Sequence, residues 1–189
     1  MLRPEYPIMT DRLILRPFVD DDLDALYSIQ SRPDVARFLY WEPRTREEVA
    51  VALRGRLAMT KIEHECDTIL LAVTRAADGV LLGDVNLRWT TEDHRGGEIG
   101  FVFHPDHQGL GYAREATTEM LRLGFEELAL HRIIGRLDAA NTASARLLSR
   151  LGMRLEGTFR QNEWVKGEWA DEAVYAILWH EWREMRLAD

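Results

Sequence analysis

The sequence predicts a layered α/β protein of the α+β type, in which helices flank a single mixed, mostly antiparallel sheet. Three observations lead to this fold class. Apolar residues recur at helical spacing in the first third of the chain, and a strand-like meander follows from Thr68 to Phe103. Beyond Phe103, helix-like and strand-like segments alternate, which adds layers to the same sheet.

Composition is that of one globular domain, and we expect residues 1–189 to form a single unit. Hydrophobic residues make up 46% of the chain and charged residues 30%. No apolar run approaches the ~20 residues of a membrane helix, and the N-terminus lacks the apolar core of a signal peptide. A single cysteine, Cys66, fits a reducing compartment such as the cytoplasm. The net charge of −8 argues against nucleic acid as a main partner.

The first third of the chain is predicted to contain one strand and two main helices. The strand is expected at about 11–17. Three aspartates precede a helical apolar pattern and are predicted to cap that helix: Asp20, Asp21 and Asp22. Thr45 and Glu48 form a capping box, which predicts a second helix that reaches about Glu63.

The middle and end of the chain supply the remaining elements. Strands are predicted at 68–74, 80–89, 98–103, 132–138, 154–160 and 169–179. Helices are predicted at about 112–128 and 142–151, and the tail after 179 is helix-prone. A turn at Asp78-Gly79 predicts a hairpin between the first two of these strands, and Thr90 to Gly97 is expected to be a loop.

The stretch from Phe101 to Leu128 carries the strongest functional signal. It runs from an apolar strand through the turn Gly109-Leu110-Gly111 into an amphipathic helix. A helix that begins on glycines presents free backbone N–H groups and the positive end of its dipole, which together favour an anion. The run lacks the lysine of a Walker loop and the third glycine of a dinucleotide fingerprint. An ordinary strand–helix turn is the simpler alternative.

Two motifs give this chain a family resemblance. Gln108, Gly111 and Ala113 fill the fixed places of Q/R-x-x-G-x-G/A, and a second block begins with Asn141 and Ser144 and ends with Gly152-Met153. In both, the chain resembles the GNAT N-acetyltransferase superfamily. Its opening, TDRLILRPF, and its ending, VKGEWADEAVYAIL, are similar to the Rim-type branch, which acetylates protein N-terminal alanines. The resemblance implies a GNAT-like fold and acetyl-coenzyme A as co-substrate, with no metal.

The resemblance also assigns residues to the coenzyme. Backbone N–H groups of the glycine turn would bind the pyrophosphate, and the end of the preceding strand would pair with the pantetheine amides. Asn141 would hydrogen-bond the pantetheine arm; its alternative role, compatible with the first, is the N-cap of the following helix. Arg114 would add a charged contact to the pyrophosphate; the alternative is that Arg114 is only a surface residue of the helix. The full set is Val102, Phe103, Gln108, Gly109, Leu110, Gly111, Tyr112, Ala113, Arg114, Asn141 and Ser144.

Transfer to an amine also needs a base. Relatives often place a glutamate on the strand before the glycine turn, and here that residue is Glu98; the alternative is a surface charge at a strand edge. His104 and His107 are further candidates, but their H-x-x-H spacing has no acidic or cysteine partner, so we expect no metal site. Asp84 is a secondary candidate for binding the substrate ammonium.

The leaving thiolate needs a proton. Many relatives use a tyrosine four places before the G-F pair, but Leu148 occupies that position here. The Rim-type resemblance points instead to Ser144 as the acid; its alternative role is helix capping. A backbone N–H near Val102 or Phe103 is expected to stabilise the oxyanion.

The acceptor side carries less signal. Tyr40, Trp41, the 89–97 loop and residues 162–169 are expected near the acceptor groove. We therefore predict an acetyl-coenzyme A-dependent transfer to a primary amine, either a protein N-terminus or a small molecule. The alternatives are a coenzyme A-binding regulatory domain without catalysis and a nucleotide-binding protein. Relatives of this kind occur as monomers and dimers, and we expect a homodimer.

Overall fold

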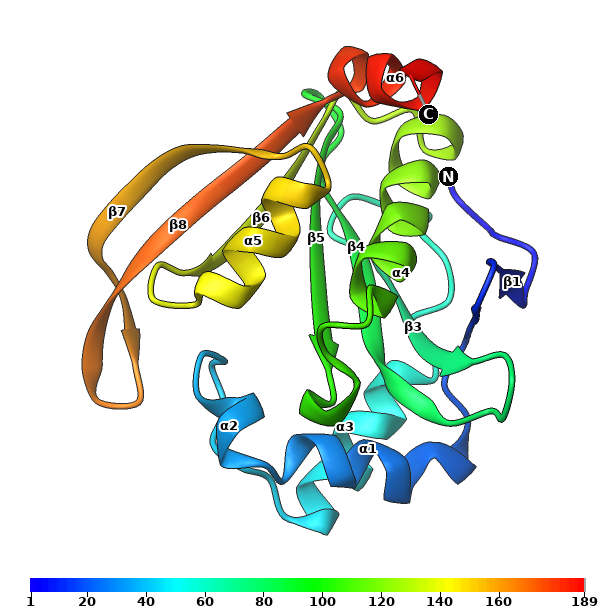
Figure 1. Ribbon diagram of the computed structural model, residues 1–189, viewed down its shortest axis with the longest axis vertical. Helices are drawn as coiled ribbons and strands as arrows, with labels where there is room; N and C mark the ends of the chain where they lie inside the picture. The colour runs from blue at the N-terminus through cyan, green and yellow to red at the C-terminus, as the bar shows by residue number, and fades with distance from the viewer. Residues whose placement is uncertain (189) are drawn as a thin grey trace.

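Eight strands form one sheet in the computed structural model, which describes residues 1–188, with helices on both faces (Figure 1). Their order is β1-β2-β3-β4-β5-β6-β8-β7, and every neighbouring pair is antiparallel except β5 and β6. The predicted mixed, mostly antiparallel sheet is thereby confirmed. The strands are β1 (Ile8–Met9), β2 (Leu13–Arg16), β3 (Thr68–Arg75), β4 (Leu81–Thr91), β5 (Gly96–Phe103), β6 (Arg132–Asp138), β7 (Arg154–Val165) and β8 (Glu168–Leu178).

The helices divide between the two faces and one end of the sheet. They are α1 (Leu23–Gln30), α2 (Pro33–Ala36), α3 (Arg46–Arg56), α4 (Tyr112–Arg122), α5 (Thr142–Arg150) and α6 (Trp179–Ala188). A wider π-type turn, Leu123–Glu127, extends α4. Figure 1 shows α6 lying across the end of the sheet where β8 finishes, beside the end of the α4 segment.

Two apolar clusters hold these layers together. The larger one joins α4 and α5 to the sheet, because alternate residues of β4 such as Val85 and Leu87 point toward the buried Met120 of α4. The smaller one packs α1 and α3 on the opposite face, with Leu26 and Leu53 fully buried or nearly so. The sheet is therefore covered on both faces, which agrees with the burial of successive residues in the central strands β3 and β4.

Strands β5 and β6 pair over only part of their length. Their register covers Gly96 with Arg132, Gly97 with Ile133 and Glu98 with Ile134. Beyond Glu98 the strands continue for several residues without pairing, and Figure 1 shows them diverging away from the end near α6. This separation opens a wedge inside the sheet, next to the glycine turn that follows β5.

Three local predictions need correction in the part of the chain before Phe103. Helix α3 ends at Arg56 rather than near Glu63, because the following chain makes backbone bonds elsewhere: Ile62 pairs with Leu2 at 2.7 and 2.9 Å. The aspartates before α1 do not cap it; Asp22 is buried and accepts hydrogen bonds from Arg16 and from the Val19 N–H. Strands β4 and β5 extend into the predicted 90–97 loop.

Candidate active site

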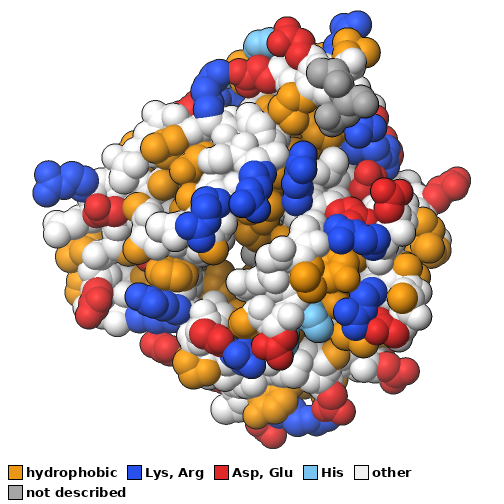
Figure 2. All heavy atoms as spheres, in the orientation of Figure 1, with side chains coloured by type: hydrophobic (Ala, Val, Ile, Leu, Met, Phe, Trp, Pro, Cys, Tyr) orange, Lys and Arg blue, Asp and Glu red, His pale blue; other side chains and the backbone are white. Residues whose placement is uncertain are grey.

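A cavity of about 790 Å³ occupies the wedge between β5 and β6. The glycine turn and the start of α5 line one end, while the segment after α2 and the β7–β8 hairpin line the other. Figure 2 shows a hollow near the middle of this face, with Lys and Arg side chains gathered over α4 and α5. Arg114 and Arg150 line the cavity from these helices, so an acidic protein presents positive charge at this place.

The structure brings most of the predicted site residues to this cavity. Those that line it are Glu98, Val102, Phe103, Gln108, Gly109, Gly111, Ala113, Arg114, Asn141 and Ser144. Leu110 and Tyr112 are not among the lining residues. The side chain of Leu110 is exposed, and the ring of Tyr112 packs against the main core and under Arg12. Any contact of these two residues with a ligand in the cavity would therefore come from their backbone.

The glycine turn has the geometry of an anion site. Gly109 and Gly111 have φ angles of +76° and +84°, a region that glycine enters without strain, and Gly111 is the N-cap of α4. The amide of Gln108 donates to the Phe103 carbonyl at 3.2 Å, which ties the turn to the end of β5. The first N–H groups of α4 have no acceptor within the helix, so they are free for a ligand.

The register of β5 shows which backbone groups face the wedge. The N–H of His104 donates to the Leu82 carbonyl at 2.8 Å, and Val102 lies opposite Asp84. In an antiparallel ladder this places the N–H of Val102 toward β4, and alternate residues point the other way. The backbone groups directed at the wedge therefore belong to Phe101 and Phe103. The prediction that Val102 and Phe103 both present backbone groups to a ligand is therefore correct in direction for Phe103 and wrong for Val102, because the backbone groups of Val102 are directed to β4.

At the start of α5, Asn141 and Ser144 have different roles. The side chain of Asn141 caps the helix by accepting a hydrogen bond from the Ser144 backbone N–H at 3.1 Å, as its N-cap alternative predicted. The Ser144 side chain is half-buried and lines the cavity. No residue in the described range 1–188 forms a hydrogen bond with its hydroxyl group. Ser144 is therefore not the capping side chain, and its hydroxyl is free to act in the cavity.

Glu98 lies at the last paired position before the strands separate. Its Oε2 is 3.7 Å from Nε of Arg136 on β6. Arg136 in turn donates from Nη1 to both oxygens of the buried Glu172, at 3.1 and 3.3 Å. Burial raises the pKa of Glu98, the charges of Arg136 and Arg88 oppose that rise, and Glu172 adds to it. The net result is a carboxylate with an increased affinity for a proton.

Three secondary candidates lie outside the cavity. Asp84 is buried and paired with Arg56 at 3.3 Å, so it is not available to bind an ammonium group. His104 uses Nδ1 to accept a hydrogen bond from the Asp106 N–H, and burial lowers the pKa of its ring. Neither His104 nor His107 lines the cavity. Among residues 1–188, no group of three or more His, Cys, Asp or Glu side chains is placed to hold a metal ion.

The acceptor end contains residues that the motifs did not identify. Arg136 and Glu172 line it, together with the expected Tyr40 and with Glu163 from the 162–169 segment. Burial and the nearby Glu163 and Glu172 charges raise the pKa of Tyr40. The sequence predicted the strands β6 and β8, which carry Arg136 and Glu172. It did not indicate that these two side chains would lie next to each other.

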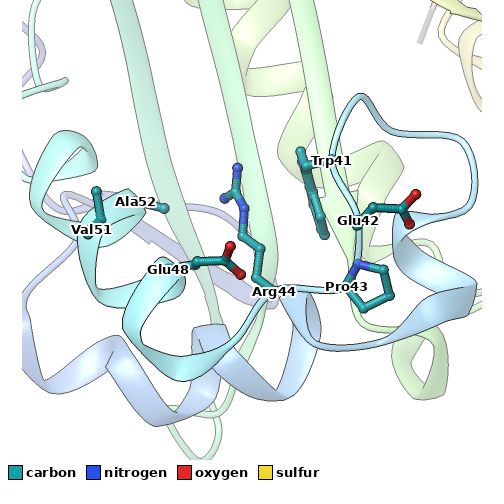
Figure 3. Close-up of a pocket in the computed structure, with 7 residues that line it drawn as sticks. All are labelled: Trp41, Glu42, Pro43, Arg44, Glu48, Val51 and Ala52. Carbon is teal, nitrogen blue, oxygen red and sulfur yellow. The ribbon is translucent and has the colours of Figure 1, made fainter. Parts of the chain in front are cut away.

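Trp41 belongs to a different hollow. It lines a smaller depression of about 430 Å³ beside α3, where the guanidinium of Arg44 lies 4.7 Å from the centre of its ring (Figure 3). The two exposed tryptophans of the hairpin, Trp164 and Trp169, pack edge to face against each other, with ring centres 5.1 Å apart, and do not line the wedge. The expectation of an aromatic acceptor groove therefore holds for Tyr40 alone among these residues.

The hairpin also contacts the opposite wall of the acceptor end. Lys166 in the β7–β8 turn donates from Nζ to the Ala36 carbonyl at the end of α2, at 2.7 Å. The same ammonium is 3.8 Å from a carboxylate oxygen of Glu42. These contacts connect two segments that are far apart in sequence and restrict the opening of the cavity on that side.

Comparison with known proteins agrees with this geometry. A family model described as an acetyltransferase (GNAT) domain matches residues 12–154. The uncharacterized N-acetyltransferase YnaD of Bacillus subtilis is 34% identical over 175 residues, which cover 93% of this chain and 98% of YnaD. A GNAT-family acetyltransferase from Bacillus anthracis has a crystal structure that matches with a TM-score of 0.82 at 31% identity, covering 92% of this chain and 99% of that chain.

A third comparison concerns the fold alone. The structure of spermidine N-acetyltransferase from Vibrio cholerae, in complex with CoA and spermine, matches with a TM-score of 0.76 at 22% identity and covers 92% of this chain and 99% of that chain.

Among residues 1–188, no helix is both long and apolar enough to cross a membrane.

Proposed function

This chain belongs to the GNAT family of N-acetyltransferases, and we propose that it transfers the acetyl group of acetyl-coenzyme A directly to a primary amine in the wedge between β5 and β6. The observation that carries the proposal is the convergence on one cavity of the glycine turn, the free edge of β5 and the partly buried Glu98. An anion site, a main-chain edge and a proton acceptor are the three features that this reaction requires.

The residues present fit the coenzyme. Backbone N–H groups at the Gly109–Gly111 turn and at the start of α4 are suited to the pyrophosphate, with Arg114 beside them. The backbone groups of Phe101 and the N–H of Phe103 suit the pantetheine amides, in the manner of an added strand, whereas the Phe103 carbonyl already accepts a hydrogen bond from Gln108. Asn141 holds the start of α5 next to this path.

The reaction then needs two proton movements. Glu98 accepts a proton from the substrate ammonium, directly or through water, and leaves a neutral amine. The amine nitrogen attacks the thioester carbonyl carbon, a C–N bond forms, and the C–S bond breaks. Ser144 donates a proton to the departing thiolate and regains one, through water, from the nitrogen of the tetrahedral intermediate, so that the products are a neutral amide and the free thiol of coenzyme A. An N–H of the free β5 edge stabilises the oxyanion between these steps.

Charge at the acceptor end favours a cationic acceptor. Glu98, Glu163 and Glu172 all line it, and Arg136 is the basic residue among them. A small amine that carries a second positive charge suits this arrangement, and the Vibrio cholerae enzyme of the same fold acts on such a compound, as its name states. A protein N-terminus, as the Rim-type resemblance suggests, is the other acceptor to test.

The first experiment measures the melting temperature with acetyl-coenzyme A, dephospho-coenzyme A and ATP. A ligand that binds only the native state stabilises it by about 2.7 kcal/mol at a hundredfold excess over its dissociation constant. We expect a rise with acetyl-coenzyme A that disappears in Gly111→Val, because a β-branched residue strains the φ of +84°. A rise with ATP alone would favour a nucleotide-binding protein and contradict the proposal.

A second experiment separates the enzyme from a coenzyme A-binding domain without catalysis. Release of free thiol is followed with a panel of diamines, polyamines and peptides with free N-termini. Turnover with any amine supports the transfer. Binding of acetyl-coenzyme A without turnover across the panel would support the non-catalytic alternative.

A further inference from the structure

Arg12 connects the N-terminal part of the sheet to the outer side of the glycine turn. It lies between β1 and β2, and its Nη1 donates to the Leu110 carbonyl at 3.0 Å. Its guanidinium also lies 4.8 Å from the centre of the Tyr112 ring. Arg12 is not among the residues that line the cavity, so it contacts the turn on the side that faces away from the cavity.

The carbonyl contact determines where the next N–H points. In a trans peptide the C=O of one residue and the N–H of the next point in opposite directions. Arg12 holds the Leu110 carbonyl outward, and the N–H of Gly111 in the same peptide is therefore directed toward the side of the cavity that Gly111 lines. A contact outside the site thus orients a donor inside it.

Glu115 introduces a charge problem that Arg12 also addresses. This glutamate lies in the first turn of α4, close to the proposed anion site, and its side chain is largely buried. Its carboxylate accepts hydrogen bonds from Arg12 Nε and the Arg12 backbone N–H, both at 2.8 Å, and from the Thr10 hydroxyl at 2.6 Å. Although burial opposes ionisation, these bonds lower the pKa of Glu115, which keeps it charged. Without a partner, that charge would repel a pyrophosphate.

We propose that Arg12 is a positioning residue for coenzyme binding, which fixes the glycine turn through Leu110 and cancels the charge of Glu115 beside the pyrophosphate. The role rests on the proposed function, because it presupposes a coenzyme at this turn. The proposal gives the N-terminal TDRL segment a role in coenzyme binding, although this segment lies outside the glycine motif. Arg12 acts through the turn and does not touch the reacting atoms.

The test compares Arg12→Ala, Glu115→Gln and the double variant with the wild-type protein. The matched control is Arg46→Ala, which removes an equally close 2.7 Å surface ion pair, with Asp24, away from the cavity. Affinity for coenzyme A is measured by titration calorimetry at a temperature where every ligand-free variant is folded. We expect Arg12→Ala to weaken binding about tenfold, the scale of one charged hydrogen bond, and the control to leave it unchanged.

Two further readouts separate positioning from general stability. Arg12→Ala should raise KM for acetyl-coenzyme A without changing KM for the amine. Adding Glu115→Gln to Arg12→Ala should restore part of the affinity, because it removes the unpaired charge. If the double variant recovers nothing, charge cancellation is overturned. If Arg12→Ala binds coenzyme A like wild type, the whole role is overturned, whereas failure of the wild type to bind acetyl-coenzyme A would contradict the proposed function itself.

Discussion

The carboxylate of Glu98 lies 3.7 Å from the guanidinium of Arg136, at the point where two neighbouring strands stop pairing. Arg136 makes shorter contacts, 3.1 and 3.3 Å, with the more deeply buried Glu172. The positive charge of Arg136 thus interacts with two carboxylates, and its interaction with Glu98 is the weaker of the two. This arrangement keeps Glu98 ionisable inside the cavity without fixing it as a structural ion pair.

Replacing Glu98 by glutamine should lower kcat while leaving coenzyme binding intact. The amide keeps the shape of the side chain but cannot accept the ammonium proton, and loss of a general base costs about 10²–10⁴-fold in rate. The measurement is steady-state turnover alongside titration with coenzyme A. The control is Glu168→Gln at the exposed start of β8. Unchanged turnover in Glu98→Gln would remove the base assignment.

The rate should depend on pH with an acid limb set by Glu98. Burial raises the pKa of Glu98 above its usual value near 4.5. A base must be unprotonated, so kcat/KM rises as pH increases through that pKa. Arg136→Gln removes a charge that lowers the pKa and should move the limb to higher pH. Glu172→Gln removes a charge that raises it and should move the limb to lower pH. Shifts in one common direction would argue against this electrostatic origin.

Ser144→Ala should reduce kcat without destabilising the fold. The helix cap at this position comes from Asn141, and the substitution leaves that bond in place because it involves the Ser144 backbone N–H. We expect a loss of about tenfold or more if the hydroxyl supplies the leaving-group proton. Ser149→Ala on the same helix is the control, since its hydroxyl bonds the Ala145 carbonyl at 2.9 Å. Equal turnover in both variants would leave Ser144 without a catalytic role.

Trp182→Ala should be among the most destabilising single changes in α6. The side chain is 2% exposed, its ring lies 5.9 Å from that of Phe125, and Nε1 donates to Glu126 at 3.2 Å. Truncating a buried tryptophan costs about 3–5 kcal/mol. Chemical denaturation measures the change, with Trp164→Ala as the control, because that ring is 60% exposed on the hairpin. Similar losses in both variants would contradict the packing described for α6.

Local patterns in the sequence predicted where elements begin better than where they end. The capping box at Thr45 is confirmed, since Thr45 N–H donates to Glu48 at 2.8 Å. The predicted end of that helix was wrong. Ile62 pairs with Leu2, and a local sequence pattern cannot indicate a pairing partner sixty residues away. Strand β7 runs to Val165, beyond its predicted end at 160. The prediction stopped too early because the residues of this strand are largely exposed and show no alternation of apolar and polar side chains.

The same distinction applies to the site. Residues of the glycine turn could be predicted because one short contiguous motif contains them. Arg136 and Glu172 could not, since they lie 36 residues apart on two strands and meet only when β6 and β8 pair. Arg12 is separated from Glu115 by 103 residues. The sequence thus indicated the chemistry, while the three-dimensional arrangement identified the residues that tune it.

The partial pairing of β5 with β6 has a consequence for solubility. Unpaired main chain at the border of a sheet is a template for strands of other molecules and so a cause of aggregation. Here the unpaired stretch lies in the middle of the sheet, enclosed by the segment after α2 and by the β7–β8 hairpin, which Lys166 fastens to the Ala36 carbonyl. The segment after α2 and the hairpin thus hinder a strand of another protein from reaching the unpaired stretch, because such a strand would bring its attached protein with it. The protein thereby displays main-chain donors and acceptors for recognition without exposing them to its own neighbours.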